Sequence, residues 1–323
     1  MNKGINVLSL CDGISGCQVS LGRANIDIKT YISSEINNDS IAVTTDNFPN
    51  TIQIGDMETL LSFDEYGKLI IYDKLINLQK IDIITAGTPC QGISKSKPIR
   101  ENLKDVRSRL FFNFVEIYKW LKVNNNPNIL FLLENVVPNK ETLKIMNEYM
   151  GCDGIMINSE LVAAQRRKRM YWTNINDGNI PMPKQKNIKI KDIIYDDKYK
   201  VFIDNRCPET RIFTKNYVKW DISGKGYYSQ QYRGYYKNGV FPTIPSKTAS
   251  DKLNIWLGEY TYRRCHPIEA ERAQTLPDNY TSCIKSYPKR LALCGDGWTI
   301  DIIAHIFSFL PKEWRLEEES NEL

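Results

Sequence analysis

No apolar run in this 323-residue sequence approaches the roughly 20 residues that a membrane-spanning helix needs. The first ten residues, MNKGINVLSL, form a strand-like run with no apolar signal segment and no cleavage site. The eight cysteines form no C-x-x-C pair and no His-rich segment accompanies them, so neither a zinc site nor a disulfide framework is indicated. We therefore expect a cytoplasmic protein with reduced cysteines and with neither a membrane nor a metal partner.

Positive charge is concentrated in one region of the chain. The net charge is +5, yet residues 184–263 hold sixteen Lys and Arg against eight Asp and Glu, a local balance of +8. The same region carries ten of the eighteen tyrosines. Cationic and aromatic side chains together suit a polyanion with stackable bases, although a solvated, lysine-rich surface would have the same composition.

Short apolar runs alternate with polar, helix-like stretches over residues 1–175. The expected strands are residues 5–10, 29–33, 81–86, 129–133, 154–158 and 170–173. Between the third and fourth of these, residues 108–123 have apolar side chains at helical spacing. Strands separated by helices predict an α/β fold, with a largely parallel sheet covered by helices on both faces. Such sheets bind ligands at the carboxyl ends of their strands.

The composition changes near residues 181–183. Short Tyr- and Gly-rich segments without helical periodicity follow, which predicts a smaller, irregular domain. Helical patterns return at residues 265–274 and 299–310.

Polar loops follow the first strands and are candidates for a ligand site. The loop after residues 5–10 consists of Cys11, Asp12, Gly13, Ile14, Ser15 and Gly16. Its glycines permit a tight turn and the close approach of a ligand. Glu35 stands at the end of the second strand, where ribose hydroxyls are commonly bound, and Asp56 and Met57 follow in a third loop. Each loop alone is more often structural, but their order suits an adenosine cofactor.

Three later segments place reactive groups near the same edge of the sheet. Cys90 follows Pro89 after the third strand, and Glu134 follows the fourth. Residues 165–169 add three arginines and a lysine before the sixth strand. A cysteine on such a loop is accessible, but a nucleophilic role requires a lowered pKa, and from position alone core packing is the commoner role.

Together these segments resemble the motifs of the cytosine-C5 DNA methyltransferase family, in the same order and over most of the chain. Residues 87–91 match the family's Pro-Cys nucleophile loop, residues 134–136 its Glu motif and residues 165–169 its Q-x-R-x-R motif. The helix after the catalytic loop is matched by Asp105, Arg107, Leu110 and Phe111. The segment after target recognition is matched by Arg264, Pro267, Glu269, Arg272, Gln274, Pro277 and Tyr280.

Two loops depart from the pattern of most bacterial members. Cys11-Asp12-Gly13 stands where Phe-Ala-Gly is usual, and residues 295–298 read Gly-Asp-Gly-Trp where Gly-Asn-x-Val is usual. Both variants look more like the vertebrate de novo DNA methyltransferases. Without the phenylalanine, one expected aromatic contact to the adenine of the cofactor is lost. This change bears on how tightly the cofactor binds and not on which cofactor is used.

The resemblance implies a Rossmann-like methyltransferase sheet and a covalent mechanism that uses S-adenosylmethionine. Cys90 would add to C6 of a flipped-out cytosine in a short, specific DNA sequence. Glu134 would bind the N3 edge and Arg167 would donate to O2, with Arg169 and Gln165 supporting the site. The residues expected to bind the cofactor are Asp12, Gly13, Ile14, Ser15, Gly16, Glu35, Asp56, Met57, Pro89, Asp296, Gly297 and Trp298.

The resemblance also implies a division of labour along the chain. Residues 1–182 would form the catalytic and cofactor-binding domain, and residues 183–283 the target-recognition domain. Residues 284–323 would form a helix that returns to the catalytic domain and an acidic tail. Residues 91–109 would close over the base, and the first candidates for phosphate contacts are Lys215, Lys219 and Lys225. Double-stranded DNA is the expected partner, in the nucleoid or the host-cell cytoplasm.

Alternatives remain at this point. A role in restriction-modification would make a cognate restriction endonuclease a partner, whereas phage self-protection or orphan regulation would not. One branch of the family methylates tRNA, but its Cys-Phe-Thr segment is absent here. A non-catalytic DNA-binding paralogue would have no need to keep Cys90, Glu134 and Arg167.

Overall fold

The computed structural model describes residues 4–66, 68–88, 106–203, 211–219, 233–246, 253–258 and 261–316. Pro89, Cys90 and Lys225 lie outside these residues, as does most of the segment 91–109. The chain divides into two compact units. Unit 1 comprises Met1–Ile157, Lys168–Met182 and Ile303–Leu323, and unit 2 comprises Asn158–Arg167 and Pro183–Ile302.

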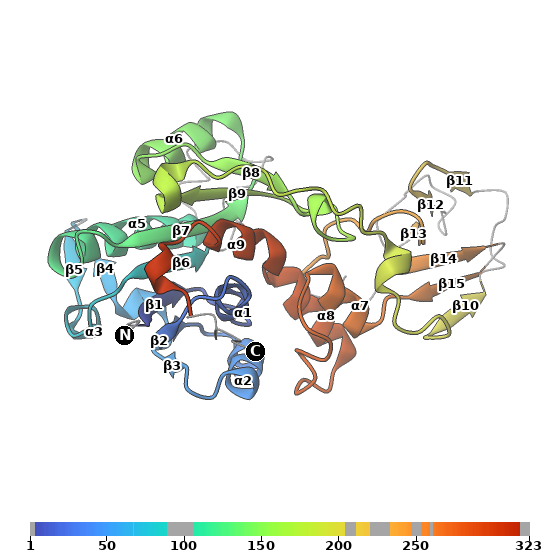
Figure 1. The fold of residues 1–323 in the computed structure, drawn as a ribbon, viewed down its shortest axis with the longest axis horizontal. Coiled ribbons are helices and arrows are strands. Elements are labelled where there is room, and N and C mark those ends of the chain that lie inside the picture. The colour runs from blue at the N-terminus through green and yellow to red at the C-terminus, as the bar shows by residue number, and fades with distance from the viewer. Residues whose placement is uncertain are drawn as a thin grey trace, which may run out of the picture. The chain divides into compact units, whose positions relative to one another are not determined.

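A seven-stranded sheet forms the centre of unit 1, with the strand order β3-β2-β1-β6-β7-β9-β8 (Figure 1). Its strands are β1 (Ile5–Leu10), β2 (Ile28–Ser34), β3 (Ile52–Gln53), β6 (Ile83–Gly87), β7 (Leu130–Val136), β8 (Ile155–Asn158) and β9 (Lys168–Thr173). All six strands expected from the sequence form, with ends shifted by a few residues. The pairs from β3 to β7 are parallel, which confirms the α/β fold class, whereas β9 runs antiparallel to β7.

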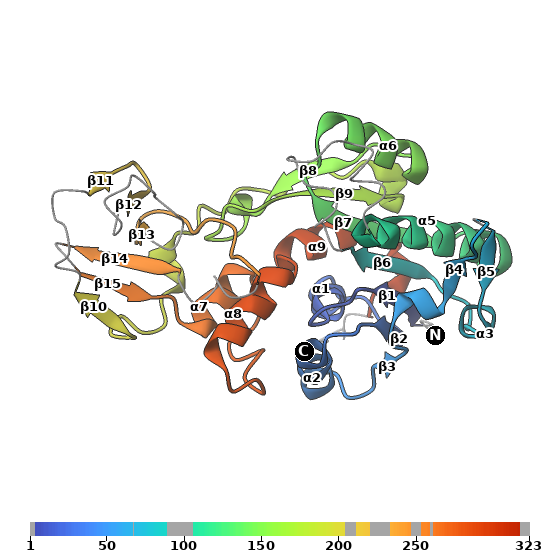
Figure 2. The same ribbon diagram turned by 180° about the vertical axis from the view of Figure 1, so that it is seen from behind.

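Helices follow most of the parallel strands. They are α1 (Gly16–Arg23) after β1, α2 (Asn38–Asn47) after β2, α5 (Val106–Asn124) before β7, and α6 (Lys140–Met150) after it (Figure 2). The short helix α3 (Asp73–Ile76) and the hairpin of β4 (Leu61–Phe63) and β5 (Leu69–Ile71) precede β6. Helix α9 (Ile300–Phe307) confirms the helical pattern predicted for residues 299–310.

Helix α5 shows why the sequence folds in this way. Phe111, Phe114 and Leu121 recur at helical spacing and pack in one buried cluster with Ile84 of β6 and Leu133 of β7. Each buried side chain of this size contributes roughly 1.5–3 kcal/mol. The helix expected over residues 108–123 is therefore confirmed, and its burial holds β6 and β7 side by side.

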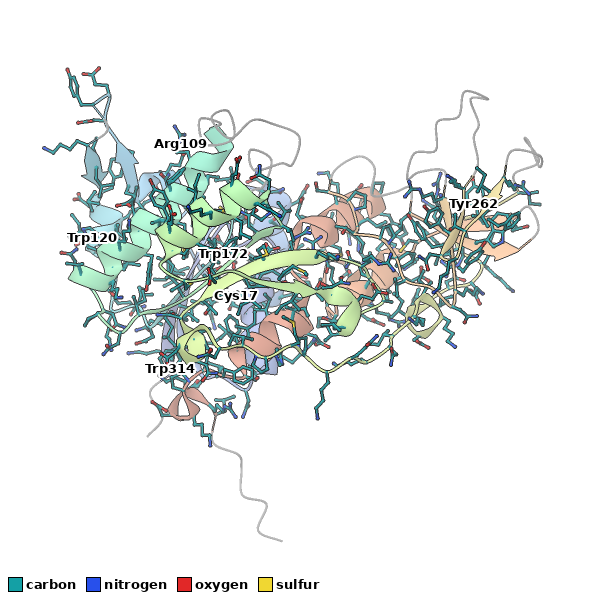
Figure 3. The ribbon with its side chains drawn as sticks, turned by 90° about the horizontal axis from the view of Figure 1, so that it is seen from above. Cys17, Arg109, Trp120, Trp172, Tyr262 and Trp314 are labelled. Atoms are coloured by element: carbon teal, nitrogen blue, oxygen red, sulfur yellow. The ribbon has the colours of Figure 1, made fainter. Side chains whose placement is uncertain are left out.

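Trp172 of β9 is buried on the same sheet (Figure 3). Its indole nitrogen donates to Asn147 Oδ1 at 2.8 Å. A Cβ atom at Gly154 would lie 2.7 Å from the indole, so only glycine fits beside this ring. The close approach keeps the chain entering β8 against β9.

Unit 2 contains a second sheet, with the strand order β10-β15-β14-β13-β12-β11. Its strands are β10 (Val201–Ile203), β11 (Ile212–Phe213), β12 (Tyr217–Lys219), β13 (Arg233–Tyr236), β14 (Asn254–Gly258) and β15 (Thr261–Arg264). Each has five residues or fewer, too few for a clear alternation of polar and apolar side chains, and sequence analysis therefore did not resolve them. Helices α7 (Pro267–Ala273) and α8 (Tyr287–Asp296) complete the unit.

Candidate active site

The carboxyl end of β6 is held in place by Asn135 of β7. The Asn135 amide donates to the carbonyl of Thr88 at 3.2 Å and to its hydroxyl at 3.0 Å, and Asn135 Oδ1 accepts from Val136 N at 2.8 Å. The Asn135 side chain is almost completely buried. Since Thr88 is the last described residue before Pro89 and Cys90, Asn135 determines where the chain leaves the sheet toward the predicted nucleophile.

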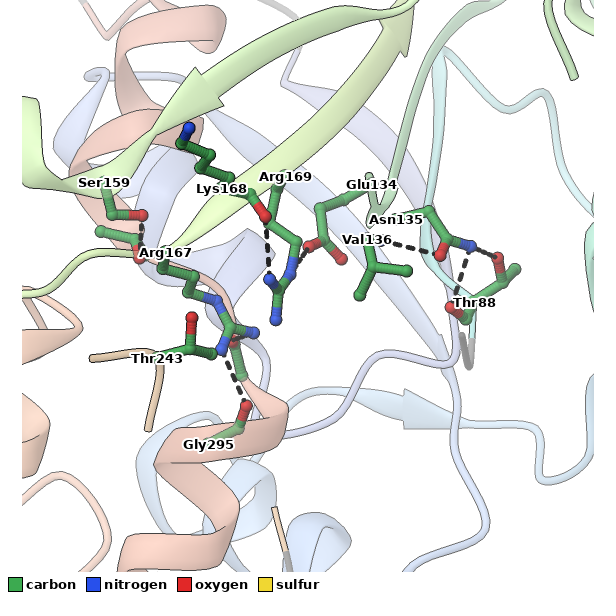
Figure 4. A network of polar contacts seen from close by, with 12 residues as sticks. Thr88, Glu134, Asn135, Val136, Ser159, Arg167, Lys168, Arg169, Thr243 and Gly295 are labelled. Carbon is green, nitrogen blue, oxygen red and sulfur yellow. Dashed lines mark hydrogen bonds and ion pairs between the residues drawn. The ribbon is translucent and has the colours of Figure 1, made fainter. Parts of the chain in front are cut away.

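Glu134 lies beside this anchor and is paired with Arg169 (Figure 4). The Arg169 Nε atom lies 2.9 Å from Glu134 Oε1, and these side chains are only 14% and 10% exposed. The antiparallel register pairs Arg169 with Val136, so the first residues of β9 meet the carboxyl end of β7. A largely buried carboxylate thus faces a fixed cation at the edge where parallel sheets bind ligands.

The other two side chains of the Q-x-R-x-R motif are engaged within unit 2. Gln165 Nε2 donates to Ala273 O and to Gln274 Oε1, both at 3.1 Å, and Gln165 Oε1 accepts from Ile244 N at 2.8 Å. Arg167 donates from its two terminal nitrogens to Gly295 O at 3.1 Å and to Gly297 O at 3.0 Å. Both side chains are buried, and both bind backbone or side-chain groups of this unit.

The carboxyl end of α8 receives these contacts, since Gly295 lies in its last turn and Gly297 directly follows the helix. A Cβ atom at Gly295 would lie 2.3 Å from the Pro245 carbonyl, so this position requires glycine. Of the three residues predicted here for cofactor binding, Asp296 is exposed, and Gly297 and Trp298 are partly buried. Gln274 adds a bond from its side-chain nitrogen to Gly297 O at 3.4 Å.

The first cofactor loop is organised around the carboxylate of Asp12. It accepts hydrogen bonds from Ser15 Oγ at 2.5 Å, Tyr31 Oη at 2.6 Å and Ser33 Oγ at 3.0 Å. Desolvation by the surrounding protein raises the pKa of Asp12, and these hydrogen bonds oppose that shift. Cys11 has φ 49, Gly13 φ 61 and Ser15 φ 55, so the loop passes three times through the left-handed region before α1 begins at Gly16, and Ile14 is buried.

The structure brings the three predicted cofactor loops together. Glu35 Oε2 accepts from Gly13 N at 2.7 Å, while Glu35 Oε1 accepts from the backbone nitrogens of Ile36 and Asn37, both at 2.8 Å. The Ser34 hydroxyl donates to Gly55 O at 2.6 Å, which joins the end of β2 to the third loop.

The third loop also contacts the first. Cys11 Sγ lies 3.4 Å from Met57 Sδ, and Asp56 accepts from Glu58 N at 2.9 Å and so caps the short 3-10 helix Met57–Thr59. Burial raises the pKa of the Cys11 thiol to about 12, so this sulfur stays protonated and unreactive at neutral pH.

Sequence analysis missed the buried charges that support unit 2. Arg263 is fully buried and binds both oxygens of Glu269, at 2.8 and 2.9 Å. The motif after target recognition begins R-x-x-x-P, so its arginine stands four residues before the proline. Counting back from Pro267 gives Arg263, and the assignment to Arg264 was wrong. Arg264 instead donates to Asn254 Oδ1 at 2.6 Å.

Two further ion pairs also went unrecognised. Glu271 is fully buried and accepts from Arg290 at 2.8 Å and from Thr281 N at 3.0 Å. In unit 1, Arg109 on the first turns of α5 donates to Glu58 at 2.7 and 2.8 Å (Figure 3). Charged side chains are read as solvent-exposed by default, so only their spacing within a motif could have signalled such pairs.

The described residues contain neither a metal-binding group nor a membrane-spanning helix. Among them, no group of three or more His, Cys, Asp or Glu side chains could hold a metal ion. None of their helices is both long and apolar enough to cross a membrane.

Comparisons with known proteins agree with this arrangement. A family profile described as C-5 cytosine-specific DNA methylase matches residues 5–312. The type II methyltransferase M.NlaIV of Neisseria lactamica is 26% identical over 213 residues, 57% of this chain and 46% of that protein. The DNA (cytosine-5)-methyltransferase DRM2 of Arabidopsis thaliana is 30% identical over 115 residues, 35% of this chain and 18% of that protein. The chain thus matches less than half of the length of these relatives.

A solved structure extends the likeness in fold to nearly the whole chain. The methyltransferase EhMeth of Entamoeba histolytica has a TM-score of 0.61 and 16% identity, covering 95% of this chain and 98% of that one. The family profile, by contrast, spans the sequence from β1 to the 3-10 helix Lys312–Trp314, including every motif described above. The chain belongs to the C-5 cytosine-specific DNA methylase family.

Proposed function

We propose that this chain is a DNA (cytosine-5)-methyltransferase that transfers a methyl group from S-adenosylmethionine to C5 of a flipped-out cytosine. The observation that carries the proposal is the Glu134–Arg169 pair at the end of β7, at 2.9 Å. The pair lies next to Asn135, which binds Thr88, and Thr88 stands two residues before Cys90 in the chain. A carboxylate and a fixed cation at the sheet edge, with a cysteine two residues further along the chain from Thr88, suit addition to a pyrimidine ring.

The proposed reaction begins with the Cys90 thiolate, whose role rests on the sequence motif. Its sulfur forms a bond to C6, and the electron pair of the C5–C6 double bond moves toward C5. Glu134 bonds to the N3 and exocyclic amine edge and stabilises the charge that develops in the ring. C5 then takes the methyl group, with S-adenosylhomocysteine as the leaving group. A solvent base removes the C5 proton, and the electron pair of that C–H bond re-forms the C5–C6 double bond and expels Cys90 as a thiolate.

The contacts of the Q-x-R-x-R motif favour a revised set of roles for its arginines. We assign the bond to the base O2 to Arg169, because this side chain is the one paired with Glu134. Arg167 and Gln165 become positioning residues. Arg167 binds the carbonyls of Gly295 and Gly297 at the end of α8, and Gln165 binds the side chain of Gln274. A fixed cation beside a carboxylate also keeps the carboxylate oriented while the base enters.

The residues of the three linked loops fit the cofactor. When bound, S-adenosylmethionine supplies an electrophilic methyl group. The left-handed turn at Gly13 exposes backbone to a ligand, and Asp12 holds that turn in shape. Each oxygen of Glu35 has a backbone partner, and a carboxylate has about four acceptor sites, so capacity remains for a ribose hydroxyl. Asp56, Met57, Pro89, Asp296, Gly297 and Trp298 are proposed to complete the site.

Target recognition is proposed for residues 183–283, which lie within unit 2. Bisulfite sequencing of DNA from cells that express the chain tests activity and recognition sequence together. Methylated cytosines in one sequence context are expected with the wild type and not with Glu134→Gln. Methylation of tRNA and not of DNA would favour the RNA branch, and methylation of neither would contradict an enzymatic role.

Grafting residues 184–263 from a family member with a different recognition sequence tests the proposed boundary. The chimera should methylate the donor's sequence. If it methylates the original sequence instead, recognition lies outside this segment.

A further inference from the structure

Unit 2 contains a cavity of about 790 Å³, and of its lining residues only Lys215, a candidate for phosphate contacts, was singled out above. It lies where the carboxyl ends of the parallel strands β13 and β14 approach the turn between β11 and β12. The charged and aromatic side chains of its lining are Glu160, Arg166, Lys189, Lys215, Tyr236, Lys237 and Trp256. Its size falls in the range of cavities that bind small molecules.

The lining carries four cations and one carboxylate. The carboxylate, Glu160, is paired with Arg166 at 2.9 Å, and Lys237 is paired at 2.9 Å with Asp197, which is not part of the lining. Lys189 and Lys215 form no ion pair with any carboxylate in the described part of the chain. Arg166 and, more weakly, the charge of Lys189 lower the pKa of Glu160, but neither Lys189 nor Lys215 is ion-paired among the described residues, so both ammonium groups can still bind an anion in a concave site where the surrounding charge is also positive.

Backbone hydrogen bonds hold the two sides of the cavity together. Ile190 N donates to Gly239 O at 3.0 Å, and Lys191 N donates to Lys237 O at 2.8 Å. Gly239 N closes the turn after β13 by donating to Tyr236 O at 2.8 Å. Lys189 and the turn at residues 237–239 are thus fixed next to each other before any ligand arrives.

Two rings form an aromatic wall. Tyr236 and Trp256 are partners in the register of β13 and β14, so their side chains stand on the same face of the sheet. Both are partly buried against the cluster of Val218 and Tyr262, which limits their motion. The Arg211 guanidinium lies over the Trp256 ring, 5.7 Å from its centroid, and the apolar surface that the two rings leave to the cavity suits a base or a sugar.

We propose that this cavity binds a nucleotide unit, with its phosphate at Lys189 and Lys215 and its ring or sugar against Tyr236 and Trp256. The two lysines that have no ion pair among the described residues indicate a phosphate, and the aromatic wall indicates a ligand larger than a simple anion. The inference rests on the proposed function in taking the nucleotide to be part of the DNA substrate, at a point outside the reacting cytosine. A free nucleotide has the same chemistry, and the experiment distinguishes the two sources.

The test measures binding and not methylation. Anisotropy of a fluorescein-labelled DNA duplex is titrated with the full chain at several salt concentrations. Lys189→Ala and Lys215→Ala should each lower the slope of log Kd against log salt by about 1. Trp256→Leu should weaken binding about 5- to 150-fold without changing the slope, because it removes stacking and not charge. Lys215→Arg should keep the wild-type slope.

Lys122→Ala is the matched control, because it removes one exposed lysine from the end of α5 in unit 1. Thermal melting checks that each variant is folded, and equilibrium dialysis with dCMP provides the second arm. Loss of dCMP binding with unchanged DNA binding would assign the cavity to a free nucleotide. Lysine variants that match Lys122→Ala in both arms would overturn the proposal. If the lysine variants alter DNA binding but the wild-type chain methylates nothing, the proposed function is wrong and the cavity proposal stands.

Discussion

Replacing Asn135 with alanine tests how the sheet positions the proposed nucleophile. The change removes the present partner of two buried groups, the Thr88 carbonyl and hydroxyl, and of the partly buried Val136 amide. Thr88 is 4% exposed and Asn135 1% exposed, so water does not readily replace the lost bonds. At about 1–3 kcal/mol for each unsatisfied group, and with some local relaxation, the free energy of unfolding should fall by about 2–4 kcal/mol.

The catalytic effect should exceed what this loss of stability explains. Thr88 stands two residues before Cys90, and a displacement of about 1 Å at a reacting group lowers the rate about 100-fold. We expect kcat to fall about 10- to 100-fold at a temperature where the variant remains folded. S-adenosylmethionine affinity, measured by calorimetry, should fall by a smaller factor than kcat, because Asp12 and Glu35 keep their contacts and of the proposed cofactor residues only Pro89 adjoins Thr88.

Asn139→Ala is the appropriate control. Asn139 caps α6 by accepting from Thr142 N at 2.8 Å, so its loss costs about 1 kcal/mol in stability without touching the end of β6. Urea titrations and single-turnover methyl transfer are measured on both variants. Equal rates in Asn135→Ala and the wild type, or an equal loss of rate in both variants, would refute the positioning argument.

Three other outcomes are expected. Cys90→Ser should abolish transfer of a radiolabelled methyl group and the covalent adduct with 5-fluorocytosine DNA while keeping DNA binding, and more than a trace of transfer would contradict its assignment as nucleophile. Glu35→Gln should weaken S-adenosylmethionine binding by about 1–3 kcal/mol in calorimetry, and an unchanged affinity would remove this residue from the site. Glu269→Gln removes the nearer carboxylate from the buried guanidinium of Arg263 and leaves it only Asp197, 3.8 Å away, so it should destabilise the protein by about 3–5 kcal/mol in urea titration, whereas an exposed pair would lose less than about 1 kcal/mol.

Much of unit 1 could be predicted because its signals are local. The apolar runs that become β1, β6 and β7 and the helical spacing of α5 each depend on side chains that are close in the chain. The ends of those strands then place Glu35 and Glu134 at one edge of the sheet without further information. The motifs added the chemistry, since the order of the segments around Cys90 and Glu134 indicated the family.

Unit 2 could not be predicted in the same way. Strands such as β11 and β12 have two or three residues, and pairing between segments far apart in the chain provides most of their stability. The exposed or buried state of an arginine is likewise not a local property. Arg263 is fully buried and its charge is paired with Glu269, whereas its neighbour Arg264 is only partly buried.

The division of roles within the Q-x-R-x-R motif shows the same limit. The sequence alone determined that Gln165, Arg167 and Arg169 belong to one motif, and that Glu134 ends a buried strand. It did not determine which arginine meets the carboxylate, since alternate residues of an extended segment differ only in their surroundings. The antiparallel register of β9 against β7 places Arg169 opposite Val136, from where its side chain reaches Glu134, and glycine carbonyls accept from Arg167 in unit 2. Only tertiary structure decides such partners, because each is contributed by another part of the chain.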